Sequence, residues 1–408
     1  MRFRLLLCCA LMATGMFAQT APNFFKPVSE ATIQLPEKAE RRLFPLKYHT
    51  FQLDYAGIKS ALQTAPQEFS PEAHKGQCAL ALPLADGSFE AFAIWEIASL
   101  EPALAAQVPF IRTFAGQSLR DPRKMVRLSY TLKGFQAMIL NPDQGVEYLD
   151  RYAERQTEYY LVYNRHDLPA SDRPQLPTFW APDVATLAMD PTVVHPDLPG
   201  AGAQSRDPQT DPIKLKVYRY IVSTTGEYGL DHGPSRDEVF SAVTEHTNRV
   251  NAILERDIDI RLQLIQASLL VTFTSPGDSP FTGSTVFDWM GQNPGVLESL
   301  SIPSTIYDIG HVYARYISGG AIGVAGGLSC ANSKARGCSG GTGSYGDGFI
   351  NVVGQELGHQ MGGGHTWNRC GGGNGRAGAT AFEPGSGSTI MSYAGACGSD
   401  NVQGYSDL

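Results

Sequence analysis

The pattern of apolar and polar positions changes character along the chain, and its clearest run lies in the second half. Residues 215–222 form an apolar, β-branched run typical of a strand. Ser235-Arg-Asp-Glu238 then has the form of a capping box, and apolar residues recur at helical spacing from Val239 to Leu254. Residues 258–264 alternate strictly between apolar and polar, as in a half-buried strand. Strand, helix and strand in this order predict the start of an α/β sandwich.

The first half has a different pattern, with short strand-like runs such as 88–97 and 125–131. Turn signals, for example Asp86-Gly87, separate these runs. Prolines then crowd residues 171–212, which predicts an extended connector. The sequence therefore predicts a β-rich first part, a proline-rich linker and a mixed second part, at residues 19–170, 171–212 and 213–408.

The first 18 residues have the features of a signal peptide. Arg2 and Arg4 precede an apolar run that ends in small residues near Ala18 and is too short to span a bilayer comfortably. We therefore expect an exported protein, with the medium, the cell surface and the periplasm all open as destinations. No later segment reaches the roughly 20 apolar residues of a membrane helix, so no membrane span is expected.

Composition agrees with a globular protein, because 42% of the residues are apolar and 18% are charged. The net charge of -8 predicts no basic surface for nucleic acid. Five cysteines remain after the signal peptide. Local spacing favours the disulfides Cys330–Cys338 and Cys370–Cys397, leaving Cys78 unpaired.

Candidate chemistry concentrates in Gln355-Glu-Leu-Gly-His-Gln-Met-Gly-Gly-Gly-His365. We expect a helix over residues 349–361, capped by Asp347, on which Gln355 and His359 project from one face. Glycine at 362 can end the helix sharply and fold His365 back towards His359. Two imidazoles beside the carboxylate of Glu356 suit an open Zn²⁺ site, at which the carboxylate acts as general base and acid.

These residues resemble the metzincin peptidases, whose motif is His-Glu-x-x-His-x-x-Gly-x-x-His followed by a methionine turn. Glu356, His359, Gly362 and His365 match at the family's spacing, and Ser388-Thr-Ile-Met391-Ser-Tyr393 looks like the methionine turn. Residues 213–400 resemble a bacterial reprolysin-like (adamalysin-related) catalytic domain, and residues 80–160 its pro-segment. The resemblance implies an α/β (α+β) fold with a twisted mixed sheet and an active-site helix.

One position departs from the family pattern, because Gln355 stands where the family has its first zinc-binding histidine. Its amide oxygen is a harder and poorer zinc ligand than imidazole. Three alternatives remain open. Zinc could be bound weakly by His359, His365 and Gln355, or Tyr393 could replace the third ligand. The protein could also be a metal-free relative that only binds partners. A one-base His-to-Gln difference at this codon is a further alternative.

The resemblance suggests roles for other residues too. Tyr393 would approach the metal or stabilise the oxyanion, against the alternative of a core tyrosine. Met391 would form an apolar floor beneath the site. Residues 319–327 would pair with an extended substrate, or form a flexible loop. The remaining histidines have no ligand spacing.

A precursor is also implied, with the pro-segment as inhibitor. The Cys78 thiolate could occupy the open zinc position, although its flanking residues fit a switch motif poorly and a buried structural cysteine is the alternative. Cleavage after Arg206 in the linker would activate the protein. Family domains usually close with a helix after the methionine turn, and the polar end of this chain leaves open a truncated C-terminus.

Together these observations predict a secreted zinc metalloendopeptidase that acts on protein or peptide substrates and is made as a latent precursor. The alternative from another class is a secreted binding module that keeps the fold without the metal. Gln355 favours that alternative, whereas the intact Glu356 and methionine turn favour the peptidase.

Overall fold

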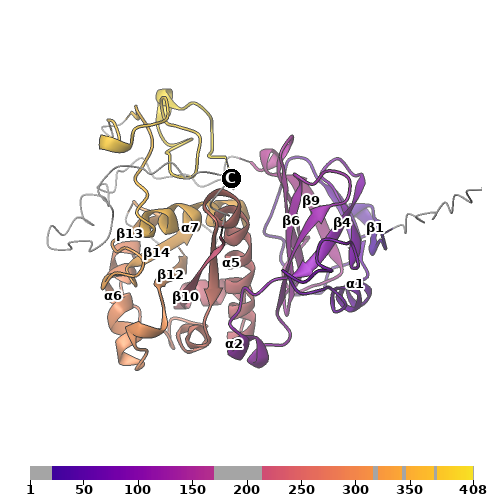
Figure 1. Ribbon diagram of the computed structural model, residues 1–408, viewed down its shortest axis with the longest axis horizontal. Coiled ribbons are helices and arrows are strands. Elements are labelled where there is room, and N and C mark those ends of the chain that lie inside the picture. The colour runs from indigo at the N-terminus through magenta and orange to yellow at the C-terminus, as the bar shows by residue number, and fades with distance from the viewer. Residues whose placement is uncertain (1–20, 170–213, 316–319, 342–345, 372–374, 408) are drawn as a thin grey trace, which may run out of the picture.

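The computed structural model describes residues 21–169, 214–315, 320–341, 346–371 and 375–407. Two sheets organise these residues, one of nine strands and one of five. We call residues 21–169 the N-terminal region and residues 214–407 the C-terminal region; they lie side by side (Figure 1). The predicted signal peptide and the whole predicted linker, including Arg206, lie outside the described residues.

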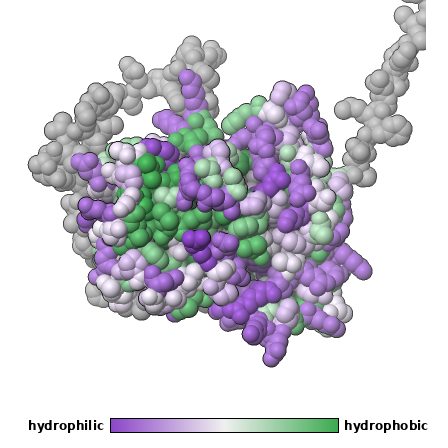
Figure 2. Space-filling view, turned by 90° about the horizontal axis from the view of Figure 1, so that it is seen from below, coloured by the Kyte–Doolittle hydropathy of each residue, from purple (hydrophilic) through white to green (hydrophobic). Residues whose placement is uncertain are grey.

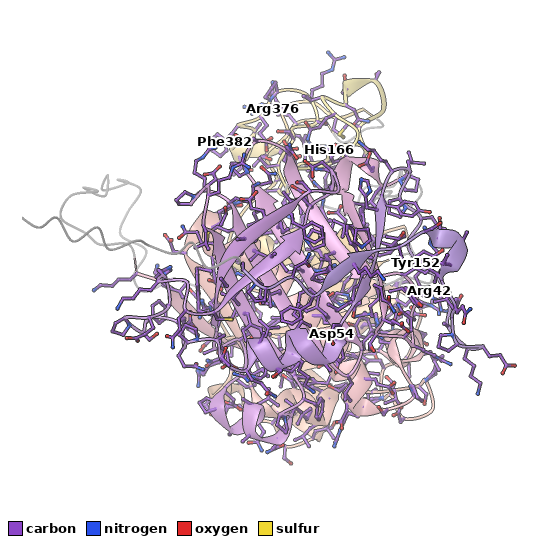
Figure 3. All side chains as sticks on the ribbon, turned by 90° about the vertical axis from the view of Figure 1, so that its right-hand side faces the viewer. Arg42, Asp54, Tyr152, His166, Arg376 and Phe382 are labelled. Carbon is purple, nitrogen blue, oxygen red and sulfur yellow. A yellow bond between two sulfur atoms is a disulfide. The ribbon has the colours of Figure 1, made fainter. Side chains whose placement is uncertain are left out.

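The N-terminal region is built on the nine-stranded sheet, in which every neighbouring pair is antiparallel and the order is β1-β2-β9-β8-β7-β6-β5-β4-β3. A bridge between Asn23, just before β1, and Ala81 of β3 brings the two ends of the sheet together, so the sheet curls around its own apolar core. Figure 3 looks onto the outer side of this region, with Asp54 at the start of α1. Its elements are β1 Phe25–Pro27, η1 Glu30–Thr32, β2 His49–Leu53, α1 Tyr55–Leu62, β3 Ala79–Pro83, β4 Phe89–Glu96, α2 Pro102–Gln107, β5 Arg112–Ser118, β6 Met125–Thr131, β7 Gly134–Asn141, β8 Gly145–Arg151, β9 Tyr159–Asn164 and η2 Arg165–Asp167.

The C-terminal region is built on the five-stranded sheet, of order β11-β10-β12-β14-β13. Four strands are parallel, and β13 alone pairs antiparallel, at the edge beside β14. The expected mixed sheet is therefore present. Its elements are β10 Lys216–Thr224, α4 Gly226–His232, α5 Arg236–Ile258, β11 Ile260–Leu264, η4 Gln266–Val271, α6 Val286–Ser299, η5 Ser304–Ile306, β12 Ile309–Arg315, β13 Gly323–Ala325, β14 Gly337–Gly341, α7 Gly346–Gln360, η6 Gly378–Thr380 and η7 Gly398–Asp400.

Helices cover both faces of this sheet, as the alternation along β12 shows. Val312 and Ala314 pack into a cluster with α6, whereas Ile309 and Tyr313 pack into the cluster that holds α5 and α7. Successive strand residues point to opposite faces, so α6 lies on one face and α5 and α7 lie on the other. The result is a three-layered α/β/α arrangement (Figure 1).

Local sequence signals set the bounds of the first crossover. The capping box is formed, since Ser235 accepts from the backbone N–H of Glu238 and the Glu238 side chain accepts from the backbone N–H of Ser235. Helix α5 ends at Ile258, and the next residue, Asp259, caps it in a left-handed conformation (φ 55°). The helix takes up Ile258, which the alternation had placed in the strand, and β11 begins at Ile260. The predicted strands at 88–97, 125–131 and 215–222 are confirmed as β4, β6 and β10 within one or two residues.

Apolar side chains gather on the underside of the molecule (Figure 2). Leu270 and Ile306 are exposed and line a pocket of about 450 Å³ beside the ends of α2 and η4. Among the described residues, no helix is long and apolar enough to cross a membrane.

Candidate metal centre

Helix α7 carries the central motif and begins at Gly346, earlier than expected. Asp347 lies inside its first turn and does not act as the predicted cap. Its buried carboxylate instead accepts from Arg165 Nε and from the Tyr148 hydroxyl, both at 2.6 Å. Asp347 does not cap the helix because Arg165 and Tyr148, far away in sequence, bind its carboxylate, and the local pattern does not reveal them.

His359 and His365 converge as their spacing predicts. The helix ends at Gln360, Gly362 takes a positive φ of 92°, and the chain folds back. The Nε2 atoms of the two imidazoles then lie 3.0 Å apart, while His359 Nδ1 is 2.7 Å from the carbonyl oxygen of Gly363. A carbonyl oxygen can only accept, so Nδ1 donates this hydrogen bond, and in the neutral imidazole Nε2 then carries the lone pair that could bind a metal.

Glu356 is buried on the same helix, at 6% exposure. Burial raises its pKa to about 8. A Cβ atom added to Gly323 would collide with the Glu356 carboxylate, so this side chain packs against the edge strand β13. Glu356 therefore lies between helix α7 and the edge strand β13.

Gln355 lies one turn before His359 and is buried at 5% exposure. Its amide nitrogen donates to the carbonyl oxygen of Ser392, at 3.4 Å. Among the described residues, no group of three or more His, Cys, Asp and Glu side chains lies close enough to hold a metal ion.

The predicted methionine turn lies beneath this helix. A Cβ atom on Gly358 would collide with the sulfur of Met391, so Met391 packs directly under α7. Tyr393 stands beside His365, with ring centroids 4.7 Å apart, and stacks on Trp367 at 3.8 Å. The structure thus places His359, His365 and Tyr393 next to one another, and Gln355 contacts Ser392 beside Tyr393. Glu356 lies on the same helix, with its carboxylate against β13.

Glu383 is a residue of this site that the sequence did not reveal. Its carboxylate accepts from the backbone N–H groups of Ser388 (2.7 Å) and Thr389 (3.1 Å), at the start of the methionine turn, and from the Thr366 hydroxyl next to His365. Partial burial alone would raise its pKa, but these hydrogen bonds outweigh that effect and lower it. No sequence pattern marks Glu383, because its partners are spread over two loops.

The cysteines follow the prediction in part. The Cys370–Cys397 disulfide is present and ties the segment after His365 to the segment after Tyr393. The predicted Cys330–Cys338 disulfide is wrong: both thiols are free. Cys338 points from β14 into the core beneath α6, whereas Cys330 is exposed on a turn.

Cys78 does not lie at the candidate metal centre formed by His359 and His365. It is buried in the core of the N-terminal region, and its thiol contacts the carbonyl oxygen of Ala61 at 3.7 Å. Burial raises its pKa, which disfavours the thiolate that a metal would need. The structure therefore supports the alternative in which Cys78 is a buried structural cysteine and not a switch.

His311 supports the C-terminal end of α7, although its sequence context suggested no role. Its Nδ1 atom donates to Gln360 Oε1 at 2.7 Å, and its Nε2 atom lies 2.9 Å from the Ser339 hydroxyl. The Gln360 amide nitrogen in turn donates to the Gly310 carbonyl oxygen at 3.0 Å. This chain of hydrogen bonds fixes α7 to β12 and β14.

Acid should destabilise the protein through His311. Burial lowers its pKa to about 4, against the opposing effect of the Gln360 hydrogen bond. The unfolded histidine takes up a proton near pH 6.5, so stability is complete above that pH and falls as pH drops towards 4. We expect this group to remove about 2 kcal/mol between pH 7.5 and pH 5. Urea unfolding of chelator-treated protein measures the loss. In His311→Gln the pH dependence should shrink by that amount, and an unchanged dependence would contradict the assignment.

Two buried imidazoles, one on α7 and one just after it, lie above the predicted methionine turn of an α/β domain, an arrangement expected of a metallopeptidase. Residues 214–405 match the family model described as metallo-peptidase family M12B, reprolysin-like. The C-terminal region therefore belongs to the reprolysin-like metallopeptidases, among the metzincins. Peptidases of this family act on proteins or peptides and are generally zinc-dependent. A search of curated proteins found no match to the chain.

Proposed function

We propose that the protein is a secreted zinc-dependent metalloendopeptidase, made as a latent precursor. The observation that carries the proposal is the convergence of His359 and His365 at the end of the helix that carries the buried Glu356. Two zinc ligands at about 2.0–2.1 Å in tetrahedral geometry would lie roughly 3.3 Å apart. The observed 3.0 Å between the two Nε2 atoms is close to that spacing. The donor set therefore fits zinc at two positions, with the Gln355 oxygen as the third.

Each residue has a defined part in this proposal. Zinc would supply a Lewis acid that lowers the pKa of a bound water. Glu356 would take the proton of the attacking water and pass it to the leaving amine. A zinc ion near this buried carboxyl group would oppose the rise in its pKa and keep it ionised for that task. Tyr393 would stabilise the oxyanion from its place beside His365.

The substrate would bind as an extended strand along β13. This strand is the edge of the sheet and packs against Glu356 at Gly323. An edge strand offers unpaired backbone groups to a peptide, and this one would hold the scissile bond near the carboxylate.

Export and latency complete the proposal. The apolar run before Ala18 supports export, and the Cys370–Cys397 disulfide is consistent with an extracellular protein. The N-terminal region would serve as the pro-segment, and cleavage in the linker near Arg206 would end latency.

The alternative is a binding module that keeps the fold and has lost the metal. Gln355 favours it, because an amide oxygen is a poor substitute for imidazole and the amide is already held by Ser392.

Zinc content of the purified full chain separates the two functions. A value near one zinc per chain, with cleavage of an unfolded protein substrate that a chelator abolishes, supports the peptidase. A value near zero, with no cleavage before or after the linker is cut, supports the binding module.

A further inference from the structure

Helix α5 is enclosed on all sides, which is unusual for a helix with so many polar residues. Every residue from Val239 to Leu254 is buried. A helix at the surface of a single domain normally leaves its polar stripe in water. Here the polar stripe faces β6 and β8 of the N-terminal region, and Asn248 Nδ2 donates to the carbonyl oxygen of Leu128 on β6 at 3.1 Å.

Buried ion pairs cross this boundary. Arg249 of α5 pairs with Asp150 of β8, and their side chains are only 5% and 9% exposed. Arg151 pairs with Glu245 at 3.1 Å, and the Thr131 hydroxyl donates to the same carboxylate at 2.6 Å. A charge in such surroundings is stable only while its partner is present.

The first turn of α7 is held from the same side. Arg165 and Asp347 form an ion pair with side chains 4% and 1% exposed. The Arg165 guanidinium also donates to the carbonyl oxygen of Ser406 and lies 5.1 Å from the ring centroid of Tyr405. His166, labelled in Figure 3, packs against Tyr405 as well. Asp347 is about 18 Å along the helix axis from His359, so the contacts around Asp347 are remote from the end of the helix that carries His359.

Backbone pairing and apolar packing add to the boundary. The N–H of Glu101 donates to the Leu264 carbonyl oxygen, and the N–H of Leu264 donates to the Ser99 carbonyl oxygen, each at 2.9 Å. The N-terminal region thereby covers the edge strand β11, which would otherwise offer open hydrogen-bonding groups. One apolar cluster runs through both regions, from Leu104 and Tyr163 to Val243 and Leu262.

We propose that the N-terminal region stays bound non-covalently to α5, α7 and β11 after the linker is cut, as a permanent subunit of the protein. Its release would leave Arg249 and Glu245 without partners, uncover β11 and divide an apolar core, so cutting one connection does not separate the two parts. This inference goes beyond the proposed peptidase function, and it holds whether or not the centre binds zinc.

The test starts with the purified full chain, cut in the linker by limited trypsin digestion and checked by mass spectrometry for cleavage at Arg206. Arg206→Gln provides the control that resists this cut. We expect both fragments to elute together at the size of the uncut chain in 0.15 M salt, at about 1 µM, and to separate only in denaturant. Separate elution in native buffer would overturn the proposal. The measurement needs neither zinc nor activity, so it is independent of the proposed function.

A charge exchange tests whether the buried pairs hold the fragments. In the cut protein, Arg249→Asp should weaken the association by roughly 100-fold or more, because Asp150 loses its partner. Combining Arg249→Asp with Asp150→Arg should restore most of the loss. Arg219→Met, which removes an exposed pair with Asp308 inside the C-terminal region, is the matched control and should leave the association unchanged. Equal behaviour of all variants would overturn the assignment of the surface.

Discussion

Gln355→His should raise the zinc affinity of the protein by at least about 100-fold. The reason is the ligand set: His359 and His365 already present their Nε2 atoms 3.0 Å apart, and the third position is filled by an amide. Changing a residue that only supports a metal ligand alters affinity by about 10–100-fold, so replacing a ligand itself should do at least as much. Competition with a chromogenic chelator at pH 7.5 gives the two affinities.

The same substitution at an exposed glutamine serves as the control. Gln63 lies at the end of α1, in the N-terminal region, and Gln63→His adds an imidazole far from the centre. Its affinity should equal that of the unchanged protein. Equal, tight binding by the unchanged protein and Gln355→His would mean that the glutamine oxygen or another group already completes the site.

The sequence predicted those parts of the fold that depend on neighbours along the chain. The capping box at Ser235 and the strand at 125–131 use contacts within a few residues, and both lie where expected. The His359–His365 pair was predictable for the same reason, since a helix followed by glycines fixes their relation. The family motif added Met391 and Tyr393, which local patterns alone would not have connected to the helix.

Long-range contacts account for what the sequence missed. Asp347 was expected to cap its own helix, but its carboxylate instead accepts a hydrogen bond from Arg165, 182 residues away. Cys330 and Cys338 are near in sequence, yet β14 directs Cys338 into the core. Glu383 organises two loops through partners that share no periodicity with it. Each of these depends on how separate elements pack, and no local pattern encodes that.

The boundary between the two regions changes how latency would operate. If the N-terminal region stays bound at α5 and the first turn of α7, removal of that region is not the activating event. Activation would then depend on the cut in the linker itself. The working enzyme would be a two-chain protein whose N-terminal region holds the first turn of α7 through Arg165.

Glu356→Gln should reduce peptide hydrolysis by about 100- to 10,000-fold, the range typical of a lost general acid–base residue. Glutamine keeps the shape of the side chain against Gly323 but cannot take a proton from water. Zinc content should stay the same, since Glu356 is not one of the proposed ligands. This separation of chemistry from metal binding distinguishes a catalytic role from a structural one.

The measurement uses an unfolded protein substrate at pH 7.5, with the linker cut, in both the natural and the Gln355→His backgrounds. The second background keeps the test decisive if glutamine limits the zinc occupancy of the natural protein. Glu298→Gln, at an exposed position of α6, is the matched control and should leave the rate unchanged. Full activity of Glu356→Gln in a zinc-loaded protein would remove Glu356 from the reaction. A loss of zinc together with activity would instead show that this carboxylate is part of the metal site. The cation would then offset the cost of burying the carboxylate charge, the cost that raises the pKa of Glu356.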